Sequence, residues 1–333
     1  MRKSMFFVLC GVMVWSWLLS GCWQPEYADQ EYIDAVPTTE TLKIKLPEGG
    51  QGGLPAPMLM TMVAPYAEFY EMTHKTTYDV NEGIAHILMW VHEILKYPVS
   101  ARDGDTYTWG PWRGDGLDPT EYKFTMGKGS EPDTFHLTFW GRHKSSESEA
   151  DFKPWIDGNV LKGSQPHHGV GTLDIYFTDA NELDPVLHPE IGRFAVTFDT
   201  INDPHDVELE LIDFQSPGDT APINGAYHYH EYADLSGDFR FFARGNVIDE
   251  SMALEQLDIR TRWLPTGEGL AEASVTGGDL DAVGWSGFTI TECWDENYFR
   301  SYYEDVIADS DLHLNPTEGE ASACPVFEQD GEA

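Results

Sequence analysis

Apolar and polar residues alternate along most of the chain after residue 105. In the clearest stretch, 207–211, valine and leucine alternate with glutamate. A two-residue period places apolar side chains on one face of a β-strand and polar side chains on the other. About a dozen stretches have this character, at residues 106–112, 122–126, 134–139, 160–162, 173–177, 193–198, 207–211, 226–232, 239–241, 257–260, 271–275 and 288–292.

Short connections rich in turn residues separate these candidate strands, as in Ser236-Gly237-Asp238. No helical pattern of useful length interrupts residues 105–292, which excludes parallel β-α-β units and leaves an antiparallel meander. A dozen strands in one twisted sheet must curl, close or split. We therefore expect a mainly β fold built as a curled sheet or half-barrel, with a two-sheet sandwich as the alternative.

A helical period precedes the strands. The apolar residues Ile84, Ile87, Leu88, Val91 and Leu95 form one stripe, which predicts an amphipathic helix over 80–96. A proline two residues further on ends it, and the strands that follow would wrap around it. A second, shorter helix is expected near 66–71.

The first residues have the layout of a secretory signal peptide. Two basic residues follow Met1, and no charged residue occurs from Met5 to Leu19. This apolar core is shorter than the roughly 20 residues that a membrane-spanning helix needs. It ends in Leu19-Ser20-Gly21-Cys22.

That tetrapeptide resembles the lipobox of bacterial prolipoproteins. The resemblance implies removal of residues 1–21, a diacylglyceryl group on the sulfur of Cys22 and a further acyl chain, such as palmitate, on its amino group. Several acyl chains give stable anchoring, so the lipid bilayer is the expected partner. Residue 23 is Trp where an Asp would imply retention in the inner membrane. The resemblance therefore implies the outer membrane if the organism is Gram-negative.

These observations divide the chain into three parts. Residues 1–21 are the signal peptide, and residues 22–57 are the lipidated cysteine followed by a flexible tether rich in proline and glycine. Residues 58–333 are expected to form a single mainly β domain.

The chain is strongly acidic, with 57 acidic and 20 basic residues and a net charge of −37. Removal of residues 1–21 takes away Arg2 and Lys3 and no acidic residue, which brings the charge to −39. This sign excludes electrostatic attraction to nucleic acid. An aromatic content of 13% argues against disorder as the meaning of the acidity.

Four cysteines are present, of which Cys10 leaves with the signal peptide and Cys22 is lipidated. The remaining Cys293 and Cys324 are expected to form a disulfide in an exported protein. Their separation of 31 positions corresponds to a stabilisation of about 3–4 kcal/mol. Free thiols, a metal pair and a redox pair are the alternatives.

The C-terminal segment carries a second distinctive pattern. A strand runs into Cys293, a polar turn follows, and the aromatic stretch 298–303 is expected to be a short helix. With the preceding Thr276-Gly277-Gly278-Asp279-Leu280, this pattern is similar to the ends of acidic lipoproteins from myxobacteria and their relatives. The resemblance covers about the last 70 residues and implies no activity.

Two kinds of metal site are candidates. His228 and His230 flank Tyr229 on a predicted strand, so their imidazoles share a face about 7 Å apart and are candidate zinc ligands. A third ligand would come from His205, Asp206 or the pair at 167–168; the alternative is a hydrogen-bonded strand face. The acidic clusters 103–105 and 115–121 offer oxygen ligands for calcium, or are ordinary solvated turns.

No enzyme class is indicated. The stretch Gly284-Trp285-Ser286-Gly287 lacks the spacing of a nucleophile elbow, and 169–171 lacks the third glycine of a dinucleotide site. The sequence therefore favours a non-enzymatic, lipid-anchored envelope protein that is a binding or structural module and needs no cofactor. The alternative is a secreted hydrolase that uses a metal or paired carboxylates on a β scaffold.

Aromatic residues suggest what a binding module would take up. Inside a curled sheet they would line a cavity for an apolar or saccharide ligand. The candidates are Trp109, Trp112, Trp140, Trp155, Trp263, Trp285, Trp294 and the tyrosines of 227–232.

Overall fold

The computed structural model describes residues 25–47, 66–218, 221–247, 253–308, 310 and 312–327, with only the backbone of 281–282. Cys22 and the signal peptide lie outside these residues. The described chain forms one sheet of fifteen strands. The strands are β1 (Ala101–Asp103), β2 (Thr106–Arg113), β3 (Thr120–Lys128), β4 (Thr134–His143), β5 (Lys153–Lys162), β6 (Gly169–Tyr176), β7 (Ile191–Asp199), β8 (His205–Gln215), β9 (Ile223–Glu231), β10 (Gly237–Gly245), β11 (Glu255–Trp263), β12 (Gly269–Thr276), β13 (Phe288–Trp294), β14 (Arg300–Ile307) and β15 (Glu318–Gly319).

Each strand pairs antiparallel with the strands that precede and follow it in sequence. This confirms the predicted mainly β meander. Within the described residues β1 and β15 do not pair, so the sheet stays open, and the strands do not separate into a two-sheet sandwich. The turn-rich connections between alternating segments close as hairpins, which explains the simple order.

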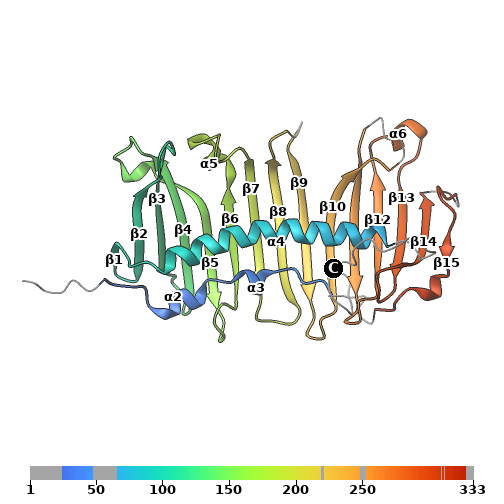
Figure 1. Ribbon diagram of the computed structural model, residues 1–333, viewed down its shortest axis with the longest axis horizontal. Coiled ribbons are helices and arrows are strands. Elements are labelled where there is room, and N and C mark those ends of the chain that lie inside the picture. Colours follow the sequence, from blue (N-terminus) through green and yellow to red (C-terminus); the bar gives the residue numbers. More distant parts are fainter. Residues whose placement is uncertain are drawn as a thin grey trace, which may run out of the picture.

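One long helix, α4 (Glu68–Leu95), crosses the sheet along the long axis of the molecule (Figure 1). It joins the two helices that the sequence indicates near 66–71 and 80–96 into a single element of 28 residues. Phe69, Tyr70, Thr73 and Thr77 extend the buried stripe toward the N-terminus. Gly83 lies within the helix without ending it, because packing on the sheet outweighs its low helix propensity.

Residues 25–47, called the arm below, lie beside α4 on the same face of the sheet (Figure 1). The sequence assigns them to a flexible tether, but they contain α2 (Gln30–Ala35) and α3 (Thr39–Leu42). Tyr32, Leu42 and Ile44 are almost completely buried. These apolar side chains account for the difference, because burying them against the sheet offsets the loss of chain entropy.

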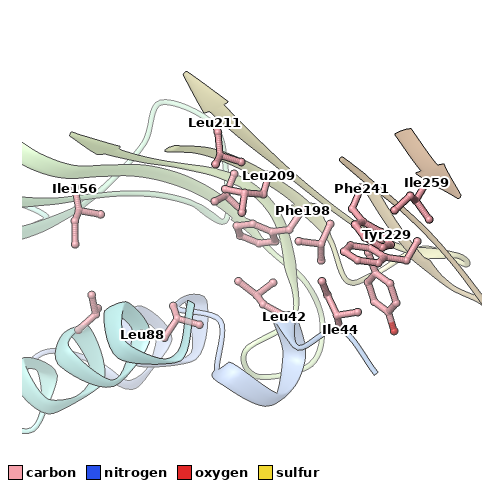
Figure 2. Close-up of a cluster of buried hydrophobic side chains, with 14 of the residues drawn as sticks. Leu42, Ile44, Leu88, Ile156, Phe198, Leu209, Leu211, Tyr229, Phe241 and Ile259 are labelled. Atoms are coloured by element: carbon pink, nitrogen blue, oxygen red, sulfur yellow. The ribbon is translucent and has the colours of Figure 1, made fainter. Parts of the chain in front are cut away.

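The core lies between the sheet and these two segments. We call the face that bears α4 and the arm the inner face, and the opposite one the outer face. Figure 2 shows Leu88 of α4 and Leu42 and Ile44 of the arm beneath Phe198 and Leu209 of the sheet. In most strands the period-two pattern therefore buries one face against a partner supplied by the same chain.

The remaining elements are short. They are α5 (Phe177–Leu183), α6 (Leu280–Val283) and two 3-10 turns (Glu149–Asp151 and Ala321–Ala323). The aromatic stretch 298–303, expected to be a helix, lies mostly in β14, because pairing with β13 extends the sheet by one more strand. No helix among the described residues has the length and apolar character needed to span a bilayer.

Candidate functional site

The inner face is the place where the sequence predicts a ligand cavity, and the chain itself occupies it. A cavity of about 20 Å³ remains between α4, the arm and β4–β7. Leu88, Val91, Leu42 and Phe198 are among its apolar lining residues. This space holds about one water molecule, far less than the several hundred Å³ of a ligand pocket.

The tryptophans expected to line a ligand cavity differ in their burial and in their neighbours. Trp109, Trp155, Trp263 and Trp294 are buried. Trp140 lies under the ammonium of Lys123, with 5.5 Å between the nitrogen and the ring centroid. The buried tryptophans therefore contribute to the core between the sheet and the segments that cover it.

A buried carboxylate holds the start of α4. Glu292 of β13 accepts hydrogen bonds from the backbone N–H groups of Glu68 (3.0 Å) and Phe69 (2.6 Å). These N–H groups have no partner within the helix, and the helix dipole favours an anion there. Arg300 of β14 donates to the same carboxylate at 2.6 Å. We call Glu292 and Arg300 the clamp.

Burial raises the pKa of the Glu292 carboxyl, whereas the two backbone N–H groups and the Arg300 guanidinium act in the opposite direction. The side chain of Glu292 has no exposed surface, and that of Arg300 is 11% exposed. Aromatic rings pack beside the clamp: Tyr70 of α4 stacks on Tyr298 with 4.1 Å between ring centroids. Helix and sheet are therefore joined at this end by charge and by aromatic packing.

Sequence reasoning missed the clamp, although a signal for it exists. Phe288, Ile290 and Glu292 alternate with polar residues, so all three project to the same face of β13. A glutamate in the third position of an apolar face requires a buried partner. That requirement points to a cation and a set of N–H donors on an opposing element.

Two histidines hold the arm. His92 of α4 bonds to the carbonyl oxygen of Pro37 at 2.9 Å, and His167 bonds to that of Val36 at 2.8 Å. The two imidazole rings lie 5.5 Å apart. Burial lowers the pKa of His92. A neutral imidazole that donates its Nε2–H to Pro37 fits this environment.

His228 and His230, the candidate zinc ligands, lie on the outer face of β9. Each faces a carboxylate of β8: His228 lies 3.4 Å from Glu208, and His230 lies 3.7 Å from Asp206. The neighbouring Asp206 carboxylate raises the pKa of His230, against the effect of burial. The imidazoles are thus arranged as separate ion-pair partners, which matches the hydrogen-bonded strand face.

In the second acidic cluster proposed for calcium, 115–121, two of the carboxylates are engaged by donors of the protein. Asp118 accepts from the backbone N–H of Thr120 at 2.7 Å and from the hydroxyl of Tyr122 at 3.1 Å. Glu121 pairs with Arg142 at 2.6 Å. In the described part of the chain, no three or more His, Cys, Asp or Glu side chains are arranged to hold a metal ion.

The two remaining cysteines are joined, as the sequence analysis expects. Cys293 and Cys324 form a disulfide with 5.3 Å between their Cα atoms. Cys293 directly follows Glu292, so the bond ties the C-terminal tail to the strand that carries the clamp. Cys22, the candidate lipidation site, lies three residues before the first described residue, Pro25.

Comparisons with known proteins complete the description of the site. Neither a protein-family model, nor a curated protein, nor a solved structure matches this chain.

Proposed function

We propose that the chain is an exported lipoprotein anchored to a membrane through acyl chains on Cys22, and that its β domain acts without catalysis through its outer surface. In a Gram-negative cell the membrane would be the outer one, since Trp23 replaces the aspartate of inner-membrane lipoproteins. The described body is then a structural or surface-binding module.

The observation that carries the second half of this proposal is the occupied inner face. A curled sheet that transports an apolar ligand needs free apolar surface, and here α4 and the arm cover that surface. The clamp and the two histidines of the arm hold both segments in place. Interactions with other molecules therefore fall to the outer face and to the ends of the sheet.

Labelling with a palmitate analogue in a bacterial host tests the anchor. We expect the wild-type protein to be labelled and Cys22→Ala to lose the label and remain unprocessed. Cys10→Ala is the matched control, because Cys10 lies in the signal peptide, and it should label like the wild type. Equal labelling of Cys22→Ala and wild type would refute the anchor.

A titration with the lipophilic fluorophore N-phenylnaphthylamine tests the occupied inner face. The native protein should give no saturable signal, since a cavity of about 20 Å³ cannot admit the ring system. Stoichiometric, saturable binding to the folded protein would overturn the proposed use of the outer surface and favour an internal ligand.

A further inference from the structure

We propose that the end of the sheet formed by β1 and β2 seats against the interface of the bilayer that holds the anchor, with Tyr27 and Tyr97 inserted among lipid headgroups. The inference rests on the proposed lipidation of Cys22. It adds an orientation: the opposite end, with β14 and β15, points away from the membrane.

The chain between the anchor and the body is short. Two residues, Trp23 and Gln24, separate Cys22 from Pro25, so the three Cα–Cα steps between them span about 11 Å at most at 3.3–3.6 Å each. The arm is already held at the next residue, where the carbonyl of Glu26 accepts from the backbone N–H of Val99 at 2.8 Å. The headgroup layer on each side of a bilayer is itself roughly 5–8 Å thick. The first held residue, Glu26, therefore lies within about 15 Å of Cys22, which keeps this end of the body close to the interface.

Exposed aromatic side chains gather at the end of the body nearest the anchor. Among the described residues, the large apolar side chains left exposed include four aromatic ones, Tyr27, Tyr78, Trp90 and Tyr97. Three of the four lie where the arm begins and α4 ends, and only Tyr78 lies in the middle of the helix. Tyr27 and Tyr97 are 53% and 59% exposed and flank the hydrogen bond between Glu26 and Val99. Tyrosine and tryptophan favour the membrane–water interface.

The charges at this end of the sheet indicate which class of lipid headgroup it contacts. Lys96 pairs with Glu93, Arg102 with Glu26 and Asp29, and a third cation, the Lys128 ammonium, with a glutamate of α2. Each of these cations is thus paired with an acidic side chain, so the described residues of this end form no basic patch for anionic lipid. This end is therefore expected to contact headgroups of zero net charge through its aromatic side chains. A body of charge −39 is repelled by any anionic lipid nearby, which favours contact through this end alone.

The long axis of the molecule sets how far the β15 end lies from the membrane. The arm begins at the β1 end, and α4 ends there after running along the long axis from β13 and β14 (Figure 1). Its 28 residues span about 42 Å at 1.5 Å per residue. A label at the β15 end is therefore tens of ångströms further from the lipid than a label on β1.

Energy transfer to headgroup-labelled lipid tests this orientation. The lipidated, mature protein carries one added cysteine for a donor fluorophore, either Ala101→Cys on β1 or Glu318→Cys on β15, both exposed positions, and is reconstituted in phosphatidylcholine vesicles. Transfer from position 101 should exceed transfer from position 318 several-fold. Equal transfer, or more from 318, would overturn the orientation. Flotation of the same vesicles separates the two proposals, because protein that fails to float refutes the anchor itself.

Two variants test the causes. A Gly/Ser linker of about 15 residues inserted before Pro25 keeps the anchor and relaxes the body, so transfer from 101 should fall toward that from 318; an unchanged value would refute the short connection as the cause. Tyr27→Ser combined with Tyr97→Ser should also lower transfer from 101. Tyr78→Ser, equally exposed but distant, is the control, and equal effects of both would refute the aromatic contact.

Discussion

The inner and outer faces of β10 and β11 differ in what holds them. On β10, Phe239 and Phe241 point inward and are fully buried, whereas Arg240 points outward and pairs with Asp258 through two hydrogen bonds of 2.9 and 2.6 Å. Burial of an aromatic side chain contributes several kcal/mol, and an exposed ion pair contributes less than one. Burial on the inner face therefore supplies most of the stability of the fold. On the outer face, ion pairs offset part of the repulsion among the many acidic side chains.

Phe239→Ala should have the largest effect. It removes a completely buried ring that stacks on Phe241 with 5.0 Å between centroids. We expect a loss of about 3–5 kcal/mol in the free energy of unfolding. Urea denaturation followed by circular dichroism measures it. A loss below 1 kcal/mol would show that the inner face does not dominate.

Glu292→Gln tests a charge on the inner face. The amide keeps the shape but leaves the Arg300 guanidinium, 11% exposed, without its buried counter-ion. We expect a loss of about 3 kcal/mol in unfolding free energy. Glu272→Gln is the matched control, because Glu272 is exposed and pairs with Arg262 at 3.1 Å on the outer face. Comparable losses in both variants would contradict the role of the clamp.

The contact between α4 and the arm should weaken in acid. Because burial lowers the pKa of His92, its contribution is complete above the unfolded pKa of about 6.5 and is lost as the pH falls through the lowered folded pKa. We expect a loss of about 1 kcal/mol, the size of one hydrogen bond. His92→Gln retains a donor for Pro37 without titrating.

Urea midpoints at pH 7.5 and pH 5 measure this effect. The midpoint of the wild type should fall more than that of His92→Gln over this range. An identical fall in both would place the acid sensitivity elsewhere, with His188, whose pKa burial also lowers, as the next residue to test.

Arg240→Ala should have the smallest effect. Both partners of the Arg240–Asp258 pair are about half exposed, so we expect a loss of 0.2–1 kcal/mol. The same denaturation assay measures it, next to Phe239→Ala on the same strand. A loss above 2 kcal/mol would mean that the outer charge pairs hold the sheet together.

The strands were predictable because their alternation is local. Val207, Leu209 and Leu211 are buried while Glu208 and Glu210 remain more accessible, as their spacing predicts. The strand β1 was missed because its three residues are all exposed and show no alternation. Residues 298–303 were misjudged because a short aromatic run fits a helix and a strand equally well.

Contacts between distant segments could not be predicted from local patterns. The arm reads as a linker because its prolines, and the glycine-rich stretch that follows at 49–53, hide the spacing of Tyr32, Leu42 and Ile44. The partners of these residues lie far along the chain. His92 and His167 lie 75 positions apart in the sequence and share no motif. The predicted pair His228 and His230 does share a face, but only the structure shows that each imidazole meets its own carboxylate.

The order of the strands has a consequence for how the chain folds. Every pairing in the sheet joins consecutive strands, so a chain that emerges N-terminus first can close one hairpin after another at small entropic cost. The start of α4 is different, because its partner Glu292 follows 224 positions later. The first turn of the helix must therefore wait for β13, and a chain stalled or cut before that strand would leave Tyr70 without its partners Trp294 and Tyr298. The helix is therefore held along its whole length only after the last strands have formed.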